Sequence, residues 1–234
     1  MDKLDNVIRK VEALLEKSRS TTFPEEQSAL EQKAQELITK YQVEASIFQR
    51  THPTSITRKE IKIPGPYTID KITLLNAIAK NNFCKLLRGK GHAVLYGYPE
   101  DIKLTLVLYN NLMTDMISEM FKDLKRSQDL GINVGSLVSW KKGYFSGYAH
   151  EVYTRLHSAR KNQSKEEKSS GNEQYALVVK GKQNLLDEYW NTVSKGSANS
   201  RQINSTQGFY TGKSSGKKAD IGLTKLSERR AIGK

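Results

Sequence analysis

The chain has 234 residues, 37% of them hydrophobic, which is enough for a folded core. It carries 38 Lys and Arg against 25 Asp and Glu, a net charge of +13, and an excess of this size is typical of proteins that bind a polyanion. The single cysteine, Cys84, excludes an intrachain disulfide, and no apolar run is long enough for a membrane span, so we expect a cytoplasmic protein without a membrane partner.

The first fifty residues predict a helical hairpin. Apolar residues recur at helical spacing from Leu4 to Leu15, which indicates a first amphipathic helix. Pro24, followed by two glutamates, is typical of the start of a second helix, whose apolar face continues to Tyr41. With 8 basic and 9 acidic residues, the hairpin domain (residues 1–50) is nearly neutral, so the positive charge lies in the rest of the chain.

Residues 51–234 predict a second, mixed domain. The alternating stretch from Ile56 to Ile63 indicates a strand, residues 69–79 a helix, and two apolar runs around residues 89–91 a β-hairpin. Two long helices should follow, one that begins at Pro99 and one that covers residues 140–161.

The end of the chain predicts less regular structure. We expect a polar linker at residues 162–174, a short strand at "YALVV" (residues 175–179), a helix at "LLDEYWNTV", and a basic Gly/Ser/Lys-rich C-terminal segment from Ser194. The predicted fold class is therefore α+β: an N-terminal helical hairpin plus a mixed domain with two long helices and a small β-sheet.

Two stretches come close to catalytic motifs. In "GFYTGKS", Gly208 and Gly212 are separated by one residue too few for a nucleotide-binding P-loop, whose length is what wraps backbone N–H groups around phosphates. In "HEVYT", Thr154 stands where the second zinc-binding histidine after His150 would be required. No complete catalytic motif is present, so we predict no catalytic residue, no cofactor and no metal ligand, and expect that the protein is not an enzyme.

Basic and aromatic residues alternate in the second long helix and near the C-terminus, a pattern that favours contact with nucleic-acid phosphates and bases. The predicted nucleic-acid-binding residues are Lys141, Lys142, Arg155, Arg160, Lys161, Arg201, Lys213, Lys217, Lys218, Phe209 and Tyr210. By helical spacing, the aromatic stripe that starts at Trp140 should belong to the core instead. Gly143 and Gly147 beside it, and Gly208, Gly212 and Gly216 in the C-terminal segment, are spaced for close helix packing.

The N-terminal motifs "IRKVEALL", "PEE" and "AQELITKY" resemble domain of unknown function 2786, a bacterial and phage family, over residues 3–48. The remainder resembles the region that commonly follows this domain, in which Gly212 and Gly216 would lie on a helix leading into a strand at residues 219–223. The resemblance implies architecture and a phage or bacterial context, hence the host cell cytoplasm if the protein is phage-encoded. It implies no activity.

Together these features predict a phage-encoded nucleic-acid-binding accessory protein that contacts the phosphate backbone, of DNA or RNA, through the basic helix and the C-terminal segment. One alternative is a module that binds or inhibits an acidic host protein or nucleoprotein complex. A second is a metal-dependent nuclease or hydrolase whose site is assembled only in three dimensions. A highly charged protein without a polyanionic partner also agrees with the composition.

Overall fold

The computed structural model describes residues 3–21, 23–51, 56–169, 173–194 and 205–221. The chain divides into two compact units: residues 1–54, 159–181 and 220–234 form unit 1, and residues 55–158 and 182–219 form unit 2. The protein contains α-helices as well as an antiparallel sheet, so the fold class is α+β, as predicted. Among the described residues, no helix is long and apolar enough to cross a membrane.

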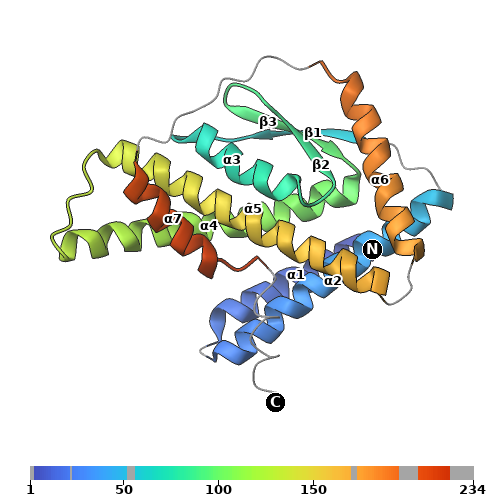
Figure 1. Cartoon of the computed structure of the whole chain (residues 1–234), viewed down its shortest axis with the longest axis horizontal. Helices are drawn as coiled ribbons and strands as arrows, with labels where there is room; N and C mark the ends of the chain where they lie inside the picture. The colour runs from blue at the N-terminus through green and yellow to red at the C-terminus, as the bar shows by residue number, and fades with distance from the viewer. Residues whose placement is uncertain (1–2, 22, 52–55, 170–172, 195–204, 222–234) are drawn as a thin grey trace. The chain divides into compact units, whose positions relative to one another are not determined.

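Unit 1 contains the predicted helical hairpin, formed by α1 (Lys3–Ser20) and α2 (Pro24–Thr51) (Figure 1). Each helix has an apolar stripe along one side, and the two stripes face each other. Burial of these apolar side chains is the main driving force for pairing of the two helices. The buried members are Val11, Leu15, Ala34 and Ile38. In the same unit, the Ser18 hydroxyl donates a buried hydrogen bond to Asp220 Oδ2 (3.3 Å).

Unit 2 contains a three-stranded antiparallel sheet in the order β1-β3-β2. Its strands are β1 (Thr57–Lys62), β2 (Cys84–Arg88) and β3 (His92–Gly97), and the last two form the predicted hairpin. Helix α3 (Thr68–Ala79) lies beside the sheet (Figure 1). The strand, the helix and the hairpin are therefore confirmed close to their predicted bounds.

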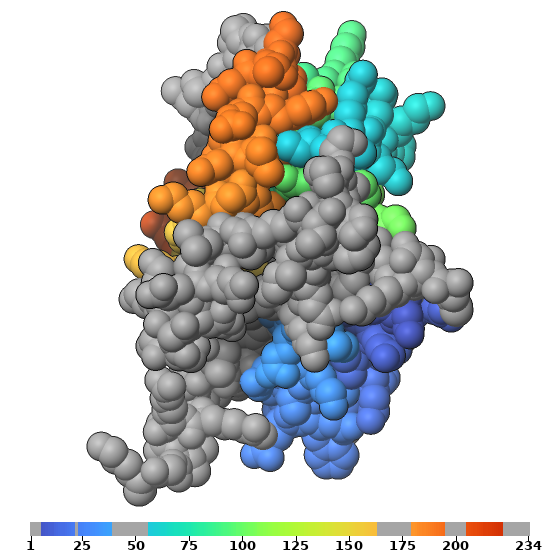
Figure 2. Space-filling view, turned by 90° about the vertical axis from the view of Figure 1, so that its right-hand side faces the viewer, coloured from blue at the N-terminus to red at the C-terminus, as the bar shows by residue number. Residues whose placement is uncertain are grey.

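Four further helices complete the described chain: α4 (Pro99–Asp129), α5 (Leu137–Ser169), α6 (Glu173–Thr192) and α7 (Thr206–Lys218). The aromatic stripe of α5 is core, as predicted, because Trp140, Tyr144, Phe145 and Tyr148 are fully or almost fully buried. On the sheet, the Tyr96 ring contacts Tyr189 and Trp190 of α6, and Figure 2 shows the described part of α6 beside the sheet and α3.

Three predictions near the C-terminus are wrong. "YALVV" is not a strand but lies within α6, and the predicted linker at residues 162–174 is helical at 162–169 and 173–174. A short apolar run has no periodicity that separates a strand from a helix, and the Lys and Glu residues before it are good helix formers. Residues 219–221 do not form the predicted strand, and residues 222–223 lie outside the described part of the chain.

Candidate nucleic-acid interface

Helices α5 and α7 pack backbone against backbone. A Cβ atom on Gly147 would overlap the carbonyl oxygen of Phe209, and one on Gly208 or Gly212 would overlap a carbonyl oxygen of α5. Because glycine alone leaves room for this approach, the spacing of the glycines has the structural purpose predicted from sequence. The residues of the apparent phosphate loop form helix α7, which begins with a hydrogen bond from Gly208 N to the Ser205 hydroxyl (3.1 Å).

Polar contacts fix the C-terminal half of α7. The Ser215 hydroxyl and the Tyr144 hydroxyl both donate to Asp123 Oδ2, at 2.7 and 3.3 Å. The Arg155 guanidinium donates to the carbonyl oxygens of Gly216 (2.7 Å) and Ala219 (2.6 Å). A cation is favourable at this end of a helix, where carbonyl groups lack partners within the helix. Arg155, one of the predicted nucleic-acid ligands, therefore caps α7.

The outer surface of the α5–α7 pair carries rings and lysines. Phe209, Lys213 and Lys217 are four residues apart and line one row along α7, and the Tyr210 side chain beside them is 64% exposed. The Phe209 ring lies 5.8 Å from both the Tyr210 ring and the His150 ring, between centroids. We call this surface the α5–α7 face and define it by Lys142, His150, Tyr153, His157, Phe209, Tyr210, Lys213 and Lys217.

One further ring contact and one carboxylate lie on the α5–α7 face. Tyr153 and His157 stack with centroids 5.7 Å apart and an interplanar angle of 13°. Lys213 Nζ lies 3.9 Å from Glu151 Oε2, so part of its charge is already balanced within the protein. The exposed ammonium groups of Lys142 and Lys217 are consequently better placed than Lys213 to meet an external phosphate.

The structure brings some of the predicted nucleic-acid-binding residues together and separates others. Lys218 is exposed in the last turn of α7, whereas Lys141 lies over the Phe121 ring of α4, 5.6 Å from its centroid. Arg160 and Lys161 lie on the stretch of α5 that belongs to unit 1. Arg201 lies outside the described residues.

Sequence reasoning did not place His150, Tyr153 and His157 in the interface. Their helical spacing places these three residues on the side of α5 opposite its buried stripe, and this could be derived from the sequence. It points to an interface only once the position of α7 beside His150 is known. At the HEVYT motif, the Thr154 hydroxyl donates to the His150 carbonyl oxygen (3.0 Å). No group of three or more His, Cys, Asp or Glu side chains placed to hold a metal ion occurs in the part of the chain that the structure describes.

Comparison with known proteins adds one match. No curated protein and no solved structure matches the chain. A family described as "Protein of unknown function (DUF2786)" matches residues 6–45, which comprise most of α1, the connection and the larger part of α2. This match confirms the resemblance to that family expected for the N-terminal hairpin.

Proposed function

We propose that the protein binds nucleic acid through the α5–α7 face, as an accessory protein in the phage or bacterial setting that the resemblance implies. The observation that supports this best is the row formed by Phe209, Lys213 and Lys217, with Tyr210 exposed beside it. Lysine ammonium groups neutralise phosphates without regard to sequence, and exposed rings stack on bases. The row therefore combines the two chemistries that a nucleic-acid strand requires.

The arrangement favours a single strand over a duplex. In a duplex the bases are stacked on each other, so a protein ring standing on a helix surface cannot lie against a base face. Tyr210 projects from a helix whose backbone is fixed against α5, which makes it a firm stacking surface. Lys213 and Lys217 follow about one and two turns further along α7, where their ammonium groups can meet phosphates of the same strand.

Binding of labelled single-stranded DNA, single-stranded RNA and duplex DNA, followed by fluorescence anisotropy, tests the proposal. Affinity should fall steeply between about 50 and 200 mM salt, because phosphate contacts release counterions. Replacing the exposed Lys142, Lys217 and Lys218 by Gln should weaken binding and flatten its dependence on salt.

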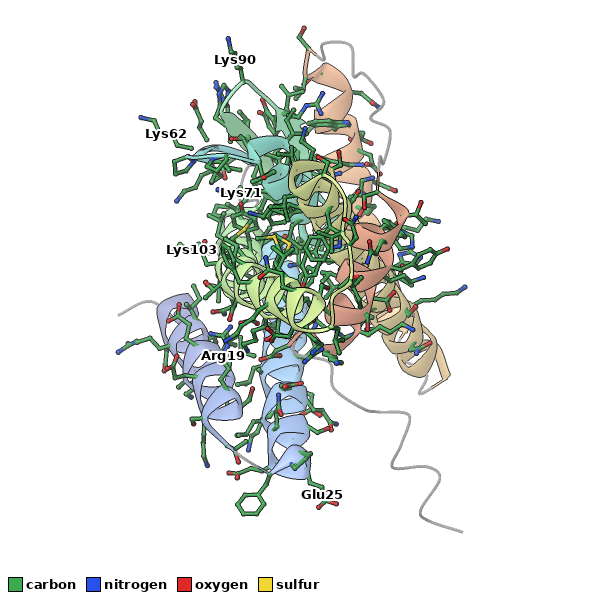
Figure 3. All side chains as sticks on the ribbon, turned by 90° about the vertical axis from the view of Figure 1, so that its left-hand side faces the viewer. Arg19, Glu25, Lys62, Lys71, Lys90 and Lys103 are labelled. Atoms are coloured by element: carbon green, nitrogen blue, oxygen red, sulfur yellow. The ribbon has the colours of Figure 1, made fainter. Side chains whose placement is uncertain are left out.

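The matched control replaces Lys59, Lys62 and Lys90 by Gln, which removes the same charge from exposed positions on and beside the sheet. Lys62 and Lys90 project from this part of unit 2 (Figure 3). If both triple variants weaken binding equally, the effect is one of net charge and the α5–α7 face is not the binding site. If the parent protein binds none of the three nucleic acids at low salt, the proposal fails altogether.

A protein partner is the second candidate, and a different surface favours it. Large apolar side chains are exposed where α4 ends and α5 begins: Leu130, Ile132, Leu137 and Val138. Exposed apolar groups that cluster in this way are common at protein-binding sites. A host protein captured in stoichiometric amount from nuclease-treated lysate by the parent, but not by a Leu130→Asp, Val138→Asp variant, would support this candidate.

A further inference from the structure

The ammonium group of Lys182 is buried in unit 2 among two carboxylates and two aromatic rings. The side chain is 3% exposed, and Nζ lies 2.6 Å from Asp101 Oδ2 and 4.0 Å from Glu100 Oε1. The same nitrogen lies 5.0 Å from the Phe83 ring centroid and 4.9 Å from the Tyr98 ring centroid. We call Phe83, Tyr98, Glu100 and Asp101 the ammonium cage.

All four cage residues come from one stretch of chain around the β-hairpin. Phe83 stands directly before β2 and has a φ of 51°, a left-handed conformation that an aromatic residue rarely adopts. Tyr98 follows β3, and Glu100 and Asp101 occupy the first turn of α4, where the helix dipole favours negative charge. The hairpin and the start of α4 thus supply the four cage residues, and α6 supplies the ammonium group of Lys182.

The cage has the chemistry of a cation-binding site. Side-chain exposure is 9% for Glu100 and 0% for Asp101, and buried carboxylates require a compensating positive charge. Ring faces add attraction for a cation within about 6 Å, and this attraction tolerates different orientations of the cation. Lys182 Nζ lies 2.6 Å from Asp101 Oδ2, so the charge of the carboxylate and the two ring faces together hold the ammonium group.

In the stretch of α6 that belongs to unit 2, few side chains are buried, although Tyr189 and Trp190 contact the Tyr96 ring. From residue 182 to residue 192, only Lys182 and Leu186 are buried. A second ion pair, between Lys85 Nζ and Asp187 Oδ1 (2.6 Å), is partly exposed on both sides, and such pairs contribute little to stability. A buried ion pair is also a weaker anchor than an apolar contact of the same size, because desolvation of the charges offsets their attraction.

We propose that the ammonium cage is a binding site for a primary alkylammonium group, and that Lys182 occupies it as an internal ligand. None of the four cage residues belongs to α6, the helix that supplies Lys182. An amine that carries the same group, such as the lysine side chain of a partner or a free alkylamine, would compete with Lys182 for the same contacts. This inference is independent of the nucleic-acid proposal, because it involves none of the residues of the α5–α7 face.

Chemical replacement of the lysine side chain tests the proposal. Lys182→Ala leaves the cage without its cation, and n-butylammonium chloride supplies an ion of nearly the missing length. Unfolding is followed by tryptophan fluorescence, since Trp140 and Trp190 both lie in unit 2 with the cage. Above the dissociation constant, the melting temperature of Lys182→Ala should rise by about 3–5 °C for each tenfold increase in n-butylammonium. The parent should show no such rise beyond that caused by equal sodium chloride.

Three controls separate this result from a general solvent effect. Neutral n-butanol should not replace the ion, and adding Asp101→Asn to Lys182→Ala should remove the response. Lys182→Met, which fills the cage without charge, should be indifferent to n-butylammonium. Equal responses of parent and Lys182→Ala, or a response that survives Asp101→Asn, would overturn the proposal.

A second experiment on folded Lys182→Ala protein distinguishes a protein lysine side chain from a small free amine as the source of the ammonium group. A lysine-containing peptide and its norleucine analogue are added in place of n-butylammonium. Protection by the lysine peptide alone identifies a protein side chain as an acceptable ligand, whereas protection by n-butylammonium alone restricts the site to small amines; both results support an ammonium site. If Lys182→Ala fails to fold even with n-butylammonium while Lys182→Met folds, the cage requires an attached side chain and the proposal is rejected.

Discussion

A Cβ atom on Gly147 would overlap the carbonyl oxygen of Phe209, so the backbones of α5 and α7 are in direct contact at this point. Each row of glycines faces the partner helix rather than solvent or a ligand. The consequence for function is that α7 is fixed against α5 by backbone contacts, with Tyr210, Lys217 and Lys218 exposed. A mobile tail with the same composition would not present its rings and charges in a fixed pattern.

Gly147→Ala should therefore destabilise unit 2. The added methyl group meets backbone atoms, which cannot move as a flexible side chain can, and overpacking of this kind costs about 1–3 kcal/mol. The melting temperature should fall by about 2–4 °C per kcal/mol. Gly181→Ala is the matched control: no atom of the described residues lies within 4 Å of its Cβ position, so alanine should stabilise its helix by up to about 1 kcal/mol. Equal effects of the two substitutions would show that α5 and α7 are not in close contact.

Two buried tyrosines one turn apart on α5 should respond differently to loss of the hydroxyl. Tyr144 donates to Asp123, so Tyr144→Phe should cost about 1 kcal/mol. The Tyr148 hydroxyl is buried without a hydrogen-bond partner among the described residues, so Tyr148→Phe should be neutral or stabilising at neutral pH. Denaturant unfolding of both variants measures the difference, and a Tyr148→Phe variant that is the less stable of the two would contradict the structure.

Alkaline pH should destabilise unit 2 because it favours ionisation of the buried tyrosine side chains in the unfolded state. Burial raises the pKa of Tyr109 from 10.0 to about 12 and raises the pKa of Tyr148 well above 10.0. Because the folded pKa lies above the unfolded one, this contribution to stability is complete below pH 10 and is lost as pH rises towards 12. Phenolate absorbance should show that Tyr109 and Tyr148 ionise only well above pH 10 or on unfolding. Ionisation of all tyrosines in one step near pH 10, with the protein still folded, would contradict this burial.

Substitutions of Arg155 and Lys217 should have different effects on the melting temperature and on nucleic-acid binding. Arg155→Gln removes the charged cap from the end of α7, so we expect a lower melting temperature together with weaker nucleic-acid binding. Lys217→Gln alters an exposed side chain and should weaken binding while leaving the melting temperature nearly unchanged. A loss of binding in Arg155→Gln without any loss of stability would instead mean that Arg155 contacts the nucleic acid itself.

Tyr210 should contribute through its ring. Tyr210→Ala should weaken binding of single strands by about 1–3 kcal/mol, whereas Tyr210→Phe should retain most of the affinity because the ring face remains. Affinity for duplex DNA should change little in either variant. Anisotropy titrations at one salt concentration provide the comparison, and an equal loss in both variants would assign the effect to the hydroxyl group rather than to stacking.

Local spacing predicted much of the fold, because helices and hairpins leave periodic signals. The glycines of α7 and the aromatic stripe of α5 were recognisable for that reason, whereas "YALVV" was not, since a five-residue apolar run is compatible with either a strand or a helix. The cap that Arg155 forms on α7 was not predictable, because sequence alone cannot show that two carbonyl oxygens lie within reach of its guanidinium group.

The buried contact of Lys182 with Asp101 could not be predicted from the sequence, for a different reason. Phe83 and Asp101 are close in sequence, but Lys182 comes from a helix some eighty residues later. Nothing in the polar stretch around Lys182 distinguishes it from the exposed lysines near it. Long-range contacts between single charged side chains leave no periodic signal, so they become visible only in the folded chain.

Ultraviolet crosslinking of single-stranded nucleic acid to the protein, followed by peptide mapping, is the most direct test of binding at the α5–α7 face. Aromatic rings stacked on bases crosslink efficiently only where the two are in contact, so we expect a crosslinked nucleotide on Tyr210 or Phe209, and its loss at high salt. Crosslinks confined to the sheet or to the N-terminal hairpin, or none at low salt, would contradict it.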